Sequence, residues 1–155
     1  MMDLEREYNQ DFHQWIEHHI TLLREGRLSE IDTGHLIEEL EDMARRDRDE
    51  LVSRLVILMA HLLKWQFQLS QLSEQWKEFD GRSWRRSIIE QRNEILRQLR
   101  NKPSLKSYLP DAVVEAYPDA VKIAAQETRL APSTFPSENP YAIEQLLDED
   151  FYPLS

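Results

Sequence analysis

The sequence predicts an all-α fold, a four-helix-like bundle around one long helix with a helical carboxy-terminal extension. Apolar residues recur at steps of three and four, and apolar–polar alternation never persists as a strand would require. Glycine occurs only three times in 155 residues, whereas strong helix formers such as leucine, glutamate and arginine are abundant. The length predicts one helical domain over residues 1–155, with its core at about 11–131 and a carboxy-terminal segment at 132–155.

The first two predicted helices have recognisable ends. An amphipathic helix covers about residues 11–24, and Gly26 follows it where a left-handed cap costs little. Asp32 is a natural N-cap for the second helix. Its apolar stripe runs through 36–69 without proline or glycine, which predicts one long helix or two nearly collinear ones. The polar run 45–50 marks the place where a bend or break would occur.

A polar connector is predicted between the second and third helices. It covers residues 70–81 and ends in the turn signal Asp80–Gly81. Ser83 then caps a third helix that runs from Trp84 to about Arg100. Pro103 marks the end of that helix.

The carboxy-terminal third contains the remaining helical signals. A fourth block covers 111–129, with Pro110 in its first turn and Pro118 expected to kink it or divide it in two. Asn139–Pro140 predicts the N-cap and first position of a short helix through 147. The tail is expected to pack through two aromatic side chains, Phe151 and Tyr152.

Several segments, taken in their order and spacing, resemble one known family. They are residues 8–15 (YNQDFHQW), 22–32 (LLREGRLSEID), 35–41 (HLIEELE), 54–66 (RLVILMAHLLKWQ), 83–92 (SWRRSIIEQR), 103–111 (PSLKSYLPD) and 135–147 (FPSENPYAIEQLL). On these segments the chain resembles the family called domain of unknown function 29, which is abundant in cyanobacteria and scattered through other bacteria. The resemblance implies an all-helical bacterial domain. It implies no activity and no functional residue, because the family has none assigned.

Composition excludes several classes of function. With no cysteine, the chain has no disulfide, thiol nucleophile or cysteine-ligated metal. The three glycines are dispersed, which excludes a P-loop, a dinucleotide-binding fingerprint and a nucleophile elbow. The net charge of -10 disfavours nonspecific binding to nucleic acid or an anionic membrane. The apolar run 55–63 is shorter than a membrane span, and residues 1–8 lack the apolar run of a signal peptide, so we expect a cytoplasmic protein without a membrane partner.

His61 is the first candidate for chemistry because it lies in the most apolar segment of the chain. No acidic residue lies three or four positions away, so its hydrogen-bond partner is expected from another helix or from water. The simpler interpretation is a core histidine. The alternative is a small helical-bundle enzyme or metal binder that uses His61 with His35, Glu38 or Glu39. No histidine follows a glutamate by three residues, as in di-metal bundles, so we expect no catalytic residue, metal or cofactor.

A basic segment at residues 82–106 is the second candidate, with eight cations against two acids. A nucleic-acid-binding module would use its aromatic and basic side chains, Trp84, Arg85, Arg86 and Arg92. The simpler interpretation is charge pairing, with Arg85 and Arg92 facing the acidic segment 30–50 across the bundle. Binding to nucleic acid is therefore not expected.

The function favoured by the sequence is a non-enzymatic protein–protein interaction module. Its partner would be an unknown protein or a second copy of the chain. Trp76 is the clearest candidate docking residue, because it lies in a polar segment, and it extends the candidate surface formed by the four side chains of the basic segment.

Overall fold

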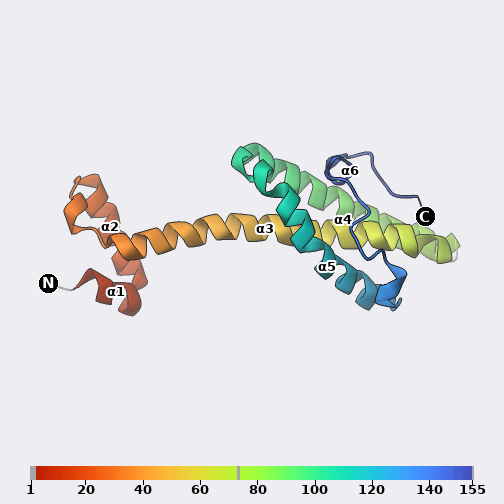
Figure 1. The fold of residues 1–155 in the computed structure, drawn as a ribbon, viewed down its shortest axis with the longest axis horizontal. Coiled ribbons are helices and arrows are strands. Elements are labelled where there is room, and N and C mark those ends of the chain that lie inside the picture. The colour runs from red at the N-terminus through yellow and green to blue at the C-terminus, as the bar shows by residue number, and fades with distance from the viewer. Residues whose placement is uncertain (1–2, 73, 155) are drawn as a thin grey trace. The chain divides into compact units, whose positions relative to one another are not determined.

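The computed structural model describes residues 3–72 and 74–154, and it is built from helices joined by short connections (Figure 1). The α-helices are α1 (Leu4–Gln10), α2 (Phe12–Arg24), α3 (Thr33–Phe67), α4 (Glu74–Asn101), α5 (Leu109–Thr128) and α6 (Ile143–Leu147). Short 3-10 turns cover Leu28–Glu30, Leu69–Gln71, Pro103–Tyr108 and Pro132–Thr134. Helices, with the 3-10 turns included, make up 81% of the described residues, and none of these residues lies in a strand, which confirms the all-α class.

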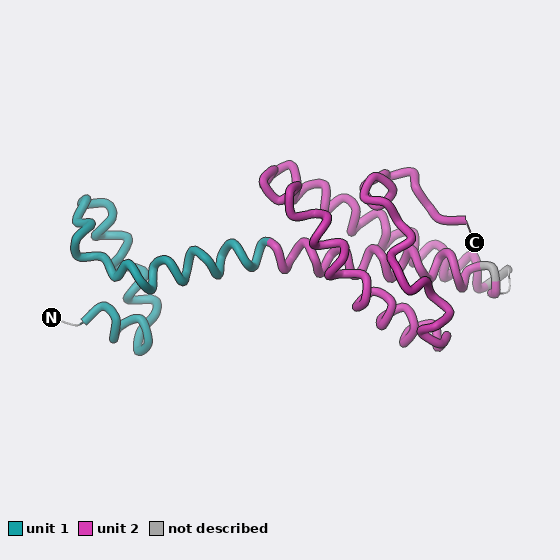
Figure 2. The backbone as a smooth tube through the Cα atoms, viewed as in Figure 1, with its two compact units in different colours: residues 1–47 teal, residues 48–155 magenta. Residues whose placement is uncertain are grey.

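The chain divides into two compact units, residues 1–47 and residues 48–155 (Figure 2). The amino-terminal unit contains α1, α2 and the first part of α3, and the carboxy-terminal unit contains the rest of α3 with α4, α5 and α6. The sequence predicts one domain, and its composition does not mark this division. α3 is one helix through the polar run 45–50, which is the first of the two predicted alternatives.

Local signals set both ends of α2, and the cap at Gly26 is the one predicted from the sequence. The Asp11 side chain accepts a hydrogen bond from the Gln14 backbone N–H at 3.2 Å and caps the helix. At the other end Gly26 has φ of 68°. The Arg27 N–H donates to the Leu22 carbonyl at 2.9 Å, and this hydrogen bond closes the helix in a Schellman turn.

The apolar core belongs to the carboxy-terminal unit. α3 supplies a row of fully buried leucines, α4 supplies isoleucines at 88 and 95, and α5 supplies buried alanines at four-residue steps from 112 to 124. Because alanine has a short side chain, this face of α5 lies close to its neighbours. Phe135, Tyr141 and Leu146 from the carboxy-terminal segment complete the same core. Phe151 and Tyr152 pack against it, as expected.

The predicted connector at 70–81 is wrong, because α4 begins at Glu74 and includes Asp80–Gly81. Gly81 is buried inside the helix, and a Cβ there would lie 3.4 Å from Leu69 Cδ1. This glycine therefore allows the turn Leu69–Gln71 to pack closely on α4, whereas the sequence pattern indicated a chain reversal. Ser83 lies within α4 and does not cap it, and Ser73 of the predicted connector lies outside the described residues.

Two further predictions on the carboxy-terminal helices need correction. Pro118 does not divide α5, which continues as one helix to Thr128. Asn139 does not cap α6, because its side chain bonds both backbone groups of Tyr141 at 2.9 Å and forms a turn. The helix begins later, at Ile143.

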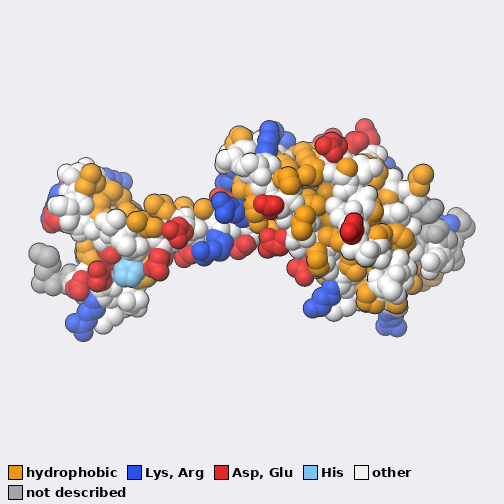
Figure 3. Space-filling model, viewed as in Figure 1, with side chains coloured by type: hydrophobic (Ala, Val, Ile, Leu, Met, Phe, Trp, Pro, Cys, Tyr) orange, Lys and Arg blue, Asp and Glu red, His pale blue; other side chains and the backbone are white. Residues whose placement is uncertain are grey.

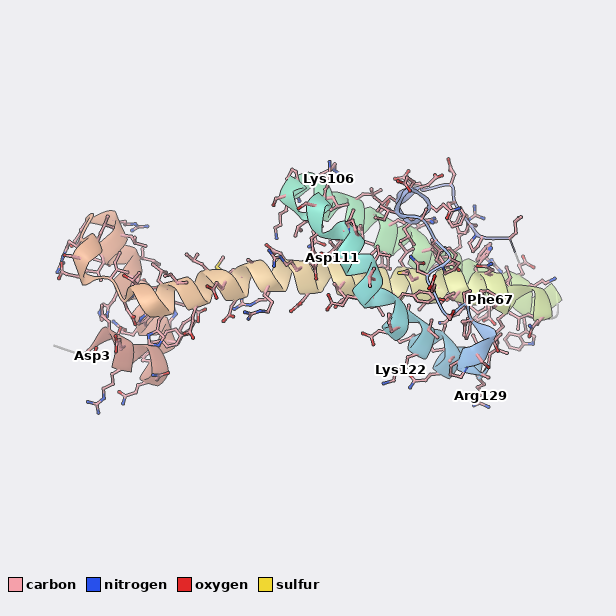
Figure 4. All side chains as sticks on the ribbon, in the orientation of Figure 1. Asp3, Phe67, Lys106, Asp111, Lys122 and Arg129 are labelled. Carbon is pink, nitrogen blue, oxygen red and sulfur yellow. The ribbon has the colours of Figure 1, made fainter. Side chains whose placement is uncertain are left out.

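A strained residue ends α5 and gives a first prediction. Arg129, labelled in Figure 4, has φ of 63°, a left-handed conformation that favours glycine. Arg129→Gly should raise the free energy of unfolding by about 0.5–1 kcal/mol, measured by urea denaturation. Arg129→Ala removes the same charge but keeps the Cβ, so it should give no gain. An equal gain in both variants would assign the effect to the side chain and contradict backbone strain.

Candidate functional site

A polar cluster at the start of α3 joins the helices of the amino-terminal unit. The Oδ1 atom of Asp32 accepts a hydrogen bond from the His35 backbone N–H at 3.4 Å, which makes Asp32 the N-cap that the sequence predicts. Its Oδ2 atom accepts from Trp15 Nε1–H at 3.2 Å and bonds to His35 Nδ1 at 2.7 Å. One carboxylate therefore both caps α3 and ties α2 to it. From the sequence, Asp32 is predicted only as the cap of the helix.

His19 adds a second link between α2 and α3. The ring is buried, with Nε2 2.9 Å from the Asp32 backbone nitrogen and Nδ1 2.9 Å from the Trp15 carbonyl oxygen. Because a backbone N–H can only donate, Nε2 accepts and Nδ1 carries the hydrogen. His19 is not among the residues singled out from the sequence, although its spacing of four residues from Trp15 places both on one face of α2.

Tyr8 of α1 completes the cluster. Its ring stacks on the His35 imidazole, with the ring centroids 3.9 Å apart, and its hydroxyl donates to Glu39 Oε1 at 2.5 Å. The hydrogen bond to the Glu39 carboxylate raises the pKa of Tyr8 to about 12. Two of the sequence candidates, His35 and Glu39, thus serve to attach α1 to α3, whereas Glu38 is exposed.

The Asp32–His35 pair carries the electrostatics of the cluster. Burial opposes ionisation of Asp32, but the hydrogen bonds from His35 and Trp15 outweigh it and hold the pKa of Asp32 below its ordinary value. The hydrogen bond to Asp32 raises the pKa of His35 above its ordinary value. The pair is therefore strongest with Asp32 ionised and His35 protonated.

His61 lies in the other compact unit and has a different environment. Its half-buried ring places Nδ1 2.8 Å from the Ile57 carbonyl oxygen, one turn earlier in α3, and burial lowers the pKa of His61. The expectation of a partner from another helix or from water was wrong, because it overlooked the backbone carbonyl four residues away. Throughout the described residues, no group of three or more His, Asp or Glu side chains is placed to hold a metal ion.

An exposed apolar surface lies on the same unit as the polar cluster. We call it the α3 apolar face, and it consists of the exposed Ile37, Leu40, Met43 and Ala44 together with the half-buried Leu36. Ile37 is 50% exposed, and Leu40 and Met43 are each 57% exposed. Hydrophobic side chains are visible along this part of α3 in Figure 3. The same stripe continues into the carboxy-terminal unit, where Leu51 and Leu55 are fully buried.

The candidate surface at the start of α4 is only partly exposed. Trp76 is 55% exposed and meets Phe79, 62% exposed, edge to face with the ring centroids 6.2 Å apart. Trp84 is half-buried. Arg85 and Arg86 are exposed, and the Arg85 guanidinium lies 5.2 Å from the centroid of the Tyr152 ring.

The prediction that Arg92 belongs to an exposed basic surface is wrong, because this residue is only 1% exposed. Its Nε donates to the Leu146 carbonyl at 2.9 Å, and its Nη2 donates to the Gln145 carbonyl at 3.1 Å. The guanidinium also lies within 6 Å of the Phe151 and Tyr152 rings. Arg92 therefore fastens α6 and the tail to α4 and is not available to a polyanion.

The predicted pairing of the basic helix with the acidic segment 30–50 is wrong for the two arginines chosen. The contacts of Arg85 and Arg92 are with the carboxy-terminal segment. One ion pair between α3 and α4 has its basic partner on α3, because Arg54 lies 3.9 Å from Glu94.

Comparison with protein families identifies the chain. Residues 7–152 match the model of the family described as Domain of unknown function DUF29. The chain belongs to this family. The match confirms the resemblance found in the sequence and spans almost the whole of this DUF29 chain. Neither the curated proteins nor the solved structures gave a match.

One general property of the DUF29 chain concerns membranes. Within residues 3–72 and 74–154, no helix combines the length and apolar character that a bilayer crossing needs.

The Asp32–His35 pair predicts a pH dependence for the amino-terminal unit of the DUF29 chain. The stabilisation by His35 is fully present below its unfolded pKa of 6.5 and is lost as the pH rises through the higher folded pKa. The stabilisation by Asp32 is present above 3.8 and is lost as the pH falls through the lower folded pKa. The free energy of unfolding of this unit should therefore fall as the pH rises above about 6.5.

His35→Gln should remove this loss of stability at higher pH. The measurement is urea unfolding at several pH values between about pH 6 and pH 8.5, with the NMR signal of the Trp15 indole N–H as the probe of unfolding. His13→Gln, at an exposed position, is the matched control and should keep the wild-type profile. If the free energy of unfolding of His35→Gln falls with pH as steeply as that of the wild type, the assignment to this pair is contradicted.

Arg92 gives a prediction for the other unit of the DUF29 chain. Arg92→Lys keeps the charge but cannot donate to two carbonyls in the fork geometry of a guanidinium. It should lower the free energy of unfolding by about 1–3 kcal/mol, measured by urea denaturation. Arg85→Lys, on the same helix but exposed, should change it by less than about 0.5 kcal/mol. Equal losses in both variants would contradict the anchoring role of Arg92.

Proposed function

We propose that this chain is a non-enzymatic protein–protein interaction module that binds its partner through the α3 apolar face. The observation that carries the proposal is the exposure of Ile37, Leu40 and Met43 on successive turns of one helix. Single exposed apolar residues are ordinary on protein surfaces, but a contiguous apolar patch marks an interaction site.

The surroundings of this face support binding to an α-helix of the partner. Apolar side chains at i, i+3 and i+4 are the anchors by which amphipathic helices dock. Polar side chains border the face on both edges, with Glu39 on one and Glu41 on the other. An apolar centre with a polar rim is the common composition of a protein–protein interface.

The polar cluster supports an interaction module rather than an enzyme. Asp32, His19 and Tyr8 use their hydrogen bonds to attach α1 and α2 to α3. This attachment fixes the start of α3 and leaves Ile37, Leu40 and Met43 exposed. The burial of Arg92 removes one of the residues on which the nucleic-acid alternative depended.

The proposal predicts that a partner is close to Leu40 in the cell. A photoreactive amino acid at position 40 of the full chain, in the native host, should give a discrete cross-linked species. The same amino acid at position 45, about 140° around the helix, is the matched control and should not. The species should disappear when Met43→Lys is added. No species at position 40, or equal yields at 40 and 45, would overturn the proposal.

A stability measurement separates binding from folding in this experiment. Because Leu40 and Met43 are each more than half exposed, Leu40→Lys and Met43→Lys should change the free energy of unfolding by less than about 0.5 kcal/mol. Loss of cross-linking with unchanged stability supports an interface. A large loss of stability would show that the face belongs to the core of the chain and would contradict the proposal.

A further inference from the structure

We propose that the α3 apolar face binds the same face of a second copy of this chain, with the two α3 helices antiparallel. This inference rests on the proposed function and names its partner. In the pairing, Leu40 of each copy lies opposite the partner's Met43.

The spacing of the stripe suits a helix pair. Leu36, Leu40, Met43 and Asp47 follow one another at steps of four, three and four residues. This is the repeat of a two-stranded seam, in which the side chains of one helix fit between those of the other. Ile37 and Ala44 lie beside the seam and widen its apolar surface.

The position of Asp47 in the stripe favours one direction of the pairing. In a parallel pair, every seam residue meets its own counterpart, so two Asp47 carboxylates would lie next to each other at one end of the seam. Two like charges in contact are unfavourable, and desolvation increases their repulsion. In the antiparallel pair, Leu40 meets Met43 at the centre, and the two Asp47 side chains lie at opposite ends of the seam.

Charges beside the seam fit the same register. Glu39 and Arg46 are seven residues apart and border the same edge of the stripe. Antiparallel pairing therefore brings Glu39 of each copy to the partner's Arg46, twice by symmetry. Arg46 is exposed and has no ion-pair partner among the residues that the structure describes. The Oε1 atom of Glu39 accepts from Tyr8, which leaves Oε2 for the second copy.

The length of the seam determines how tightly we expect the two copies to bind. Residues 36–47 cover about 18 Å of helix, which is a short interface. We therefore expect a reversible dimer with a dissociation constant of about 1–100 µM. Such a dimer forms at high local concentration and dissociates on dilution.

The first test is sedimentation equilibrium of the purified full chain between about 2 and 500 µM. The wild type should dimerise, and Leu40→Lys should be monomeric. Arg46→Glu should weaken dimerisation at least tenfold, because it places two carboxylates opposite each other at both ends. Arg45→Glu changes the net charge equally on the far side of the helix and should keep the dimer. A monomeric wild type, or a dimer unaffected by Leu40→Lys, would overturn the inference.

A second test measures direction without relying on charge. Because the chain has no cysteine, Leu40→Cys and Met43→Cys each introduce a single thiol. Under mild oxidation, a mixture of the two variants should form mainly the mixed 40–43 disulfide, as antiparallel pairing requires. Predominant 40–40 and 43–43 disulfides would overturn the antiparallel direction.

The outcomes keep this inference separate from the proposed function. If the purified chain is monomeric but position 40 cross-links in cells to a protein other than this chain, the interaction module stands and the homodimer fails. If position 40 gives no cross-link and the chain is monomeric, both fail. A dimer that needs Leu40 but ignores Arg46→Glu supports the interaction module and overturns the register.

Discussion

The apolar stripe of α3 is the constraint on which the rest of this structure depends. A helix with a long apolar stripe must cover it, because exposed apolar surface costs about 25 cal/mol per Å². In the carboxy-terminal unit, α4 and α5 cover the stripe, and Leu51, Leu55 and Leu58 are fully buried. In the amino-terminal unit, Leu40 and Met43 of the same stripe are exposed. The carboxy-terminal unit therefore covers its part of the stripe with its own helices. The amino-terminal unit, as we propose, covers its part with a partner.

The amino-terminal unit depends on polar contacts more than on an apolar core. The buried side chains among its described residues are Glu7, Trp15, His19 and Leu22, and two of these four are polar. Glu7 is satisfied on one oxygen by His18 at 2.6 Å, and His19 uses both ring nitrogens. A hydrogen bond contributes only about 1 kcal/mol net, so such a unit gains much from covering its remaining apolar surface.

The basic α4 shows how composition misleads when burial is unknown. The segment 82–106 has a clear excess of cations, which is typical of a surface for polyanions. Arg92 instead donates hydrogen bonds to the carbonyls at the end of α6, which is a favourable place for a cation, and its guanidinium lies 5.6 Å from the centroid of the Tyr152 ring. A charge count cannot distinguish these roles, because it does not record which side chains the chain later covers.

The sequence by itself determined the helical class, the family and the ends marked by Asp32 and Gly26, because capping and backbone freedom act between near neighbours. It also placed His35, Glu39 and the α3 stripe on helix faces, but it could not find their partners. Only the tertiary structure decided that Asp32 joins Trp15 to His35, that Arg92 is buried, and which half of the stripe is covered. Each of these depends on residues brought together across the chain, such as the 54 positions between Arg92 and Leu146, and helical periodicity carries no information at that range.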